Sequence, residues 1–149
     1  MTEKLFFEDL QPKWRLSVGS FYVNTQEMRD FALKWDPLPQ HIEDAAAGPG
    51  GITAPGLYMF AIKMALIGKM PSPFAVIASG GYDEVRFTAP ICAGDVVTLL
   101  IETVEARASK SKQDRGIVTL RMSLINQTGV VCMTHLDTIF VLRRSAIAS

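Results

Sequence analysis

Asp36 and His41 lie five residues apart in the segment Asp36-Pro37-Leu38-Pro39-Gln40-His41, and together they could hold and polarise one water molecule without a metal. A carboxylate and an imidazole can each accept or donate a proton in acid–base chemistry. The two prolines fix their own φ and restrict the residue before them, so this segment cannot simply continue a helix. The structural alternative is that Asp36 opens a turn and His41 begins a short helix, because Asp is a common turn residue.

A glycine-rich segment follows, Gly50-Gly51-Ile52-Thr53-Ala54-Pro55-Gly56, and leads into an apolar stretch over residues 57–67. Pro55 suits the first position of a helix. Gly56 would leave its backbone N–H unpaired at the positive end of the helix dipole, with no side chain in the way. Such an N–H can stabilise a carbonyl oxygen as it becomes an enolate. We therefore expect Thr53, Pro55 and Gly56 to contact a substrate, the alternative being an ordinary Gly/Pro helix start.

In these motifs the sequence resembles the MaoC-like hydratases and dehydratases, which include the (R)-specific enoyl-CoA hydratases. That family carries an Asp-x-Asn-Pro-x-His motif, matched by Asp36, Pro39 and His41, and an Ala-x-Gly step before a long central helix, matched by Ala54-Pro55-Gly56. Leu38 stands where many members have Asn, which removes an amide that could orient the water or the catalytic pair. Further matching segments, within a resemblance that spans residues 6–143, are Val85-Arg86-Phe87-Thr88-Ala89-Pro90, Gly94-Asp95 and Asn126-Gln127-Thr128-Gly129.

The resemblance implies reversible addition of water to the α,β double bond of an acyl thioester, of the enoyl-CoA or 3-hydroxyacyl-CoA type used in fatty acid metabolism. Asp36 and His41 would hold the water, Gly56 would bind the thioester oxygen, and no cofactor is expected. Which of the pair is the base stays open. Two alternatives remain: a hotdog acyl-CoA thioesterase, and a catalytically impaired acyl-thioester-binding dimerisation domain.

Basic residues gather in the polar segment 107–115, which contains Arg107, Lys110, Lys112 and Arg115. Arg and Lys are natural partners of phosphates, so we expect this segment to contact the phosphates of a CoA substrate. The alternative is a solvated hairpin tip. Arg86 is a second candidate for the same role, unless it pairs only with Asp83 or Glu84.

The order of elements predicts one domain over residues 1–149, of class α+β with the hotdog fold. Strands are expected at about residues 14–23, 74–88, 95–108, 116–126 and 130–142, forming an antiparallel sheet of about five strands around a long central apolar helix. That helix, from Pro55, has Lys63 as its only charge and should be buried on most sides. We expect another helix with Thr25 as its N-cap, ending at Asp36-Pro37, and a short helix over residues 41–47. The resemblance implies a homodimer joined through the sheets, or a higher homo-oligomer.

The composition of the chain limits the classes of molecule that it is expected to bind. The formal net charge is zero without a basic block, which argues against nucleic acid. Cys92 and Cys132 are isolated, so we expect reduced core residues and no metal site. No signal peptide is recognised and the apolar stretch is too short to cross a membrane, so a cytoplasmic protein without a membrane partner is expected.

His135 and Asp137 share one face of a predicted strand, and we expect that face to contact solvent or a dimer partner rather than to form a second catalytic pair.

Overall fold

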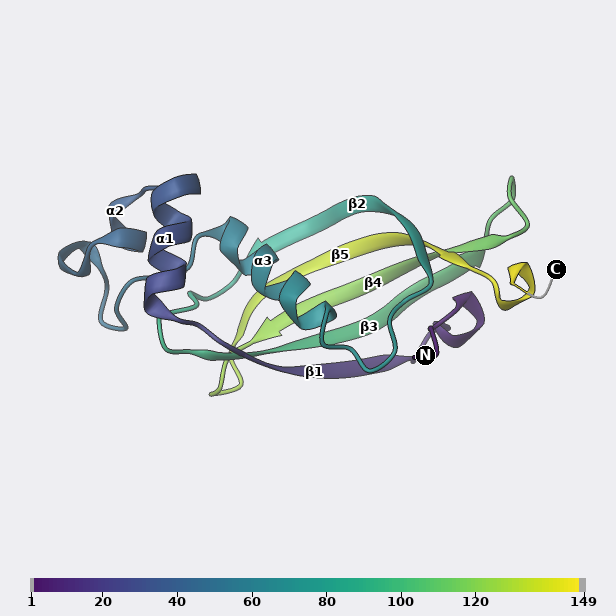
Figure 1. Ribbon diagram of the computed structural model, residues 1–149, viewed down its shortest axis with the longest axis horizontal. Helices are drawn as coiled ribbons and strands as arrows, with labels where there is room; N and C mark the ends of the chain where they lie inside the picture. Colours follow the sequence, from purple (N-terminus) through teal and green to yellow (C-terminus); the bar gives the residue numbers. More distant parts are fainter. Residues whose placement is uncertain (1, 148–149) are drawn as a thin grey trace.

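The computed structural model describes residues 2–147, which form one antiparallel sheet with one helix over a face of the sheet and the other helices at one end (Figure 1). The order of the strands in the sheet is β1-β3-β4-β5-β2, and each predicted boundary lies within two residues of the observed one. The five-stranded hotdog arrangement is therefore confirmed. The strands are β1 (Arg15–Tyr22), β2 (Val76–Phe87), β3 (Val96–Ala108), β4 (Arg115–Ile125) and β5 (Val131–Leu142).

Three helices lie between β1 and β2: α1 (Thr25–Trp35), α2 (Pro39–Ile42) and α3 (Gly56–Ile67), the last with 12 residues. Short 3-10 turns occur at Phe7–Asp9, Asp44–Ala46 and Arg144–Ala146. The expected N-cap of α1 is off by one residue, because the side chain of Asn24, not Thr25, accepts a hydrogen bond of 3.0 Å from the N–H of Glu27. The helix expected over residues 41–47 is α2 followed by a separate 3-10 turn, since Glu43 between them is extended.

The central helix α3 packs one face on the sheet and leaves the opposite face open. Its buried residues are Tyr58, Met59, Ile62, Lys63 and Leu66. Leu57 and Met64 on the outer face are 59% and 52% exposed. The expectation that α3 is buried on most sides is therefore wrong for a single protomer, because one sheet can cover only one side of the helix.

Inward-facing residues alternate along the central strands and form the core under α3. On β4 these include Val118, Leu120 and Met122. On β5 the same face carries His135 and Asp137, which are only 1% and 5% exposed. The expectation that this face meets solvent or a dimer partner is wrong. The fold tolerates a buried carboxylate there because Lys63 of α3 lies across from it, with its Nζ 3.6 Å from Asp137 Oδ2.

The sheet has two edges, β1 and β2, and β2 is exposed along nearly its whole length. Its exposed large apolar residues are Val76, Ile77, Tyr82 and Phe87. Unpaired apolar edges are usually covered in native proteins. This edge and the open face of α3 therefore form one uncovered surface of the protomer.

The two ends of the sheet differ. Helices α1 and α2 and the start of α3 gather at one end, and the hairpin that joins β3 to β4 extends from the other (Figure 1). Within the described residues, no helix is both long and apolar enough to cross a membrane.

Replacing Asn24 by Ala should destabilise the fold by about 1 kcal/mol, because one N–H in the first turn of α1 loses its cap. Thr25→Ala is the matched control and should change the free energy of unfolding little. Urea denaturation of both variants measures the difference. A larger loss of unfolding free energy for Thr25→Ala would show that Thr25 is the N-cap, as expected from the sequence.

Candidate active site

Asp36 is placed by the end of α1. Its N–H donates to the carbonyl of Ala32 at 2.9 Å, and its backbone then leaves the helical region. Pro37 cannot continue the helix, and the N–H of Leu38 donates back to the Asp36 carbonyl at 2.9 Å. The carboxylate is thereby held at the end of a rigid helix with 31% of its side chain exposed.

His41 is buried on α2, which begins at Pro39. Its Nδ1 lies 2.6 Å from the carbonyl oxygen of Thr53, with the Thr53 hydroxyl farther away at 3.4 Å. A carbonyl oxygen can only accept, so Nδ1 must carry the proton in this bond. In the neutral ring, Nε2 is then the unprotonated nitrogen and keeps a free lone pair.

The structure brings Asp36 and His41 together as the sequence predicts. His41 Nε2 lies 3.6 Å from Asp36 Oδ2, which is too long for a direct hydrogen bond. A neutral imidazole and an ionised carboxylate both accept at these two atoms. A water molecule about 2.8 Å from each could donate one hydrogen to each of them. Its oxygen lone pairs would then point away from the pair and be free to attack.

Thr53 connects this pair to α3. Its N–H donates to the carbonyl of Gln40 at 3.2 Å while its carbonyl holds His41, so the loop is fastened to α2 at two points. Pro55 is the N-cap of α3 and Gly56 its first residue. Among residues 2–147 no acceptor lies on the Gly56 N–H. This free donor at the positive end of the helix dipole follows Thr53 by only three residues.

Gly56 also has a packing role that the sequence did not reveal. A Cβ at this position would lie 2.8 Å from Cζ of Phe87. The phenyl ring at the end of β2 thus occupies space that we expected to be free of side chains. Because Phe87 is 53% exposed, its ring has room to move.

Leu38 is the N-cap of α2 and makes no side-chain cap. Its carbonyl accepts from the N–H of His41 at 3.0 Å, and its side chain is 48% exposed. Asn is among the preferred N-cap residues. An Asn at this position would therefore cap the helix that carries His41.

The basic residues expected to contact phosphates separate into two groups. Strand β3 has 13 residues and rises about 3.3 Å per residue, so its far end lies roughly 40 Å from its start. Arg107, Lys110, Lys112 and Arg115 therefore lie at the end of the sheet opposite Asp36, within one protomer (Figure 1). Arg115 is paired with Asp114 at 2.7 Å, and this hydrogen bond lowers the pKa of the Asp114 carboxyl.

Arg86, by contrast, lies next to Phe87 at the same end as Gly56. It is exposed, and its guanidinium donates to the Val85 carbonyl at 2.8 Å. Within the part of the chain that the structure describes, it forms no ion pair with Asp83 or Glu84. Of the predicted phosphate contacts, Arg86 is the one placed near the site in its own protomer.

A second polar cluster lies beneath α3, and it joins His135 and Asp137, which the sequence did not favour as a catalytic pair, to Lys63 and Tyr82, which were not candidates. Lys63 donates to the Tyr82 hydroxyl at 3.0 Å and lies 3.6 Å from Asp137. Burial is the largest cause that lowers the pKa of His135, to about 4, and burial also raises the pKa of Asp137. The lone lysine in an apolar helix was the available signal, together with His135 and Asp137 spaced two residues apart. In residues 2–147, no group of three or more His, Cys, Asp or Glu side chains is placed to hold a metal.

Known proteins resemble this chain in sequence and structure. Residues 13–135 match a family model described as "FAS1-like, dehydratase domain region". A MaoC-like dehydratase from Rhodospirillum rubrum superposes with a TM-score of 0.86 and 32% identity, over 94% of this chain and 98% of that one. A monoamine oxidase regulatory protein from Archaeoglobus superposes with a TM-score of 0.81 and 25% identity, over 95% of this chain and 96% of that one. An (R)-hydratase from Pseudomonas aeruginosa superposes with a TM-score of 0.70 and 21% identity, over 95% of this chain and 88% of that one. No curated protein sequence matches.

Leu38→Asn should stabilise the protein by about 1 kcal/mol, because the new side chain can accept from an N–H in the first turn of α2. Thermal or urea unfolding measures the gain. Leu38→Ala is the control, since it shortens the exposed side chain without adding a cap. A variant with Asn that gains catalytic activity but no stability would assign the amide to the water instead.

Proposed function

Because the chain belongs to the FAS1-like dehydratase family, we propose that it reversibly adds water to the α,β double bond of an acyl thioester of the enoyl-CoA type. The observation that carries this proposal is the pairing of His41 Nε2 with Asp36 Oδ2, 3.6 Å apart, beside the start of α3. The names of the similar structures, a dehydratase and an (R)-hydratase, support the same reaction. The proposed chemistry uses two side chains and one backbone N–H of this chain together with water and the substrate, without a cofactor.

In the proposed reaction, the water held by Asp36 and His41 attacks the β carbon of the enoyl thioester. One of its protons passes to Asp36 or His41, and the other stays on the new hydroxyl. The electron pair of the double bond moves toward the thioester oxygen, which becomes an enolate oxygen. The Gly56 N–H and the positive end of α3 stabilise this charge.

The second half of the reaction returns the proton. The protonated member of the pair delivers it to the α carbon, and the enolate collapses to the saturated 3-hydroxyacyl thioester. Water thus supplies both the hydroxyl and the new hydrogen, so the pair ends each turnover in its starting state. The carbonyl of Thr53 keeps His41 oriented throughout, because Nδ1 donates to it in either protonation state.

We propose that the acting form is a homodimer joined through β2. The uncovered edge of β2 and the open face of α3 support it. Antiparallel pairing of two β2 edges reverses the direction of the partner, so the Val76 end of one strand lies beside the Phe87 end of the other. The partner's hairpin with Arg107, Lys110 and Arg115 then comes to the same end as Asp36. In that assembly the hairpin and Arg86 could both contact the phosphates of CoA.

We place the protein in the cytoplasm. Both cysteines, Cys92 and Cys132, are free in the structure. Structural disulfides are rare in the reducing cytosol, and a chain with two unpaired thiols fits that compartment.

Asp36→Asn and His41→Ala should each abolish most hydration of an enoyl-CoA while the fold is kept. The two groups act on one water, so the double variant should be little worse than either single variant. Loss of the conjugated thioester absorbance follows the rate, and circular dichroism confirms folding. Near-normal turnover in either single variant would contradict the proposal.

Product analysis by mass separates the alternatives. A 3-hydroxyacyl thioester supports hydration. Free acid and thiol would instead show a thioesterase, which could use the same oxyanion donor. Binding of acyl-CoA without any turnover would show a catalytically impaired binding domain.

Gly56→Val should lower turnover by about 10²–10³-fold, the effect of losing one oxyanion donor, because the side chain blocks the approach of the thioester to the N–H. Because a side chain at position 56 also meets the Phe87 ring, the experiment needs a second comparison in which that ring is removed. Phe87→Leu gives the new side chain room, so Gly56→Val should be combined with Phe87→Leu and compared with Phe87→Leu alone. If the double variant recovers both stability and activity, Gly56 serves only the packing of Phe87.

A further inference from the structure

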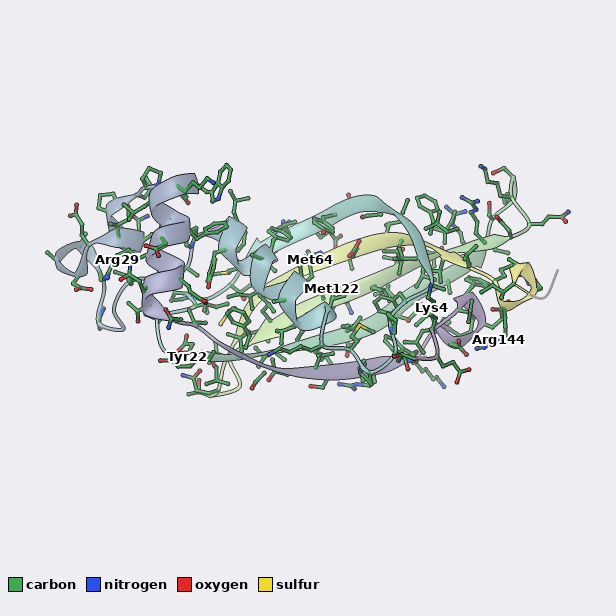
Figure 2. The ribbon with its side chains drawn as sticks, viewed as in Figure 1. Lys4, Tyr22, Arg29, Met64, Met122 and Arg144 are labelled. Carbon is green, nitrogen blue, oxygen red and sulfur yellow. The ribbon has the colours of Figure 1, made fainter. Side chains whose placement is uncertain are left out.

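A pocket of about 240 Å³ lies between the C-terminal half of α3 and the sheet. Most of its wall is apolar and includes Met64, Met122 and Ile139. Met64 on α3 and Met122 on β4 are labelled in Figure 2. Three polar residues also line it, Ser79 and Tyr82 from β2 and Asp137 from β5. An otherwise apolar pocket with a few converging polar groups is the usual form of a small-molecule site.

The polar wall depends on a buried ion pair that is poorly explained by stability. Lys63 is fully buried and Asp137 is 5% exposed. Their closest atoms are 3.6 Å apart, beyond the range of a good charge-assisted hydrogen bond. Apolar residues of similar volume in place of a buried pair are often neutral or stabilising. The pair thus requires another reason, and one member of it, Asp137, lines the pocket.

Asp137 has unused hydrogen-bonding capacity. An ionised carboxylate offers about four acceptor positions. In the structure it has the Ser79 hydroxyl at a long 3.4 Å and the Lys63 ammonium at 3.6 Å. A ligand group that donates to Asp137 and accepts from Ser79 would fill both deficits.

The charge balance decides which group fits. Lys63 already offsets the charge of Asp137, so a cationic ligand would be repelled by Lys63 and an anionic one by Asp137. A neutral hydroxyl can donate one hydrogen bond and accept another. It therefore matches the wall without adding a charge to a buried site.

We propose that this pocket receives the distal part of the acyl chain and selects chains that carry a hydroxyl group there. The inference rests on the proposed function, because it names the class of acyl chain that the same site accepts. Asp36, His41 and Gly56 hold the reacting end of the thioester, and the pocket binds the distal end of the acyl chain.

The acyl chain would reach the pocket from the partner's site. Within one protomer, Phe60 follows Gly56 by about one turn of α3, and its ring is stacked on that of Tyr82, which lines the pocket, with ring centroids 5.3 Å apart. The pocket is bordered instead by Val76 and Ile77, which are 50% and 40% exposed at the start of β2. Antiparallel pairing of β2 with the partner sets this border beside the partner's Phe87 and Gly56. Each pocket would then serve the site of the other protomer.

The test compares two enoyl-CoA substrates whose acyl chains have the same number of non-hydrogen atoms, one ending in a hydroxymethyl group and one in an ethyl group, over a series of medium chain lengths. For the wild-type protein, kcat/KM should favour the hydroxylated substrate by about tenfold at the best length, which corresponds to about 1.4 kcal/mol. The double variant Lys63→Met with Asp137→Leu makes the wall apolar and should reverse the preference. Thr138→Val is the control, because its side chain points to the opposite face of β5.

The outcomes separate this inference from the proposed function. Hydration without any preference for the hydroxylated chain would overturn the inference and leave the proposed function standing. If neither substrate is hydrated, calorimetric binding of the matching saturated acyl-CoAs decides: a hydroxyl preference that the double variant loses supports the pocket, whereas equal binding or none overturns it. Should the double variant fail to fold, Ser79→Ala is used instead, and an undiminished preference in that variant would overturn the inference.

Discussion

The hydrogen bond from His41 Nδ1 to the carbonyl oxygen of Thr53, 2.6 Å long, links the parts of the site that act together in the proposed reaction. It fastens α2 to the loop before α3, so the imidazole and the free N–H of Gly56 keep a fixed relation. It also sets the tautomer, because a carbonyl accepts only from a protonated nitrogen. Nε2 is thereby left as a proton acceptor that faces Asp36. Without this bond, the same residues would not present two acceptors to one water.

The single sheet covers one face of α3 and leaves the other face of the helix exposed. Its inner face buries one side of α3, and residues 2–147 form no further layer over the other side. The exposed Leu57 and Met64 lie next to the uncovered β2 edge in the proposed interface. A surface that is apolar on both a helix and a strand edge is typical of an obligate contact. Dimerisation would then complete the substrate site as well as the core.

The sequence predicted the order and type of the elements well, because period-two patterns and Gly/Pro breaks are local signals. The Asp36–His41 pair was also predictable, since the two residues are held by one short segment. The inward orientation of the His135 and Asp137 side chains was not predictable from the sequence. A strand pattern shows which residues share a face, but the partner that stabilises a buried carboxylate, Lys63, is distant in sequence. The separation of Arg107 from the site was hidden too, because it depends on how far a long strand extends.

Lys63 has two partners beneath α3, the Tyr82 hydroxyl and the Asp137 carboxylate. In the sequence it interrupts an apolar helix, and in the structure it is the charge that allows Asp137 to stay in the core. Removing Lys63 alone would leave that carboxylate unpaired, which is far more costly than removing both charges. The pair is therefore expected to be kept or lost as a unit. A core that retains it, although an apolar core would be easier to build, is explained if a ligand hydroxyl uses the open positions of Asp137.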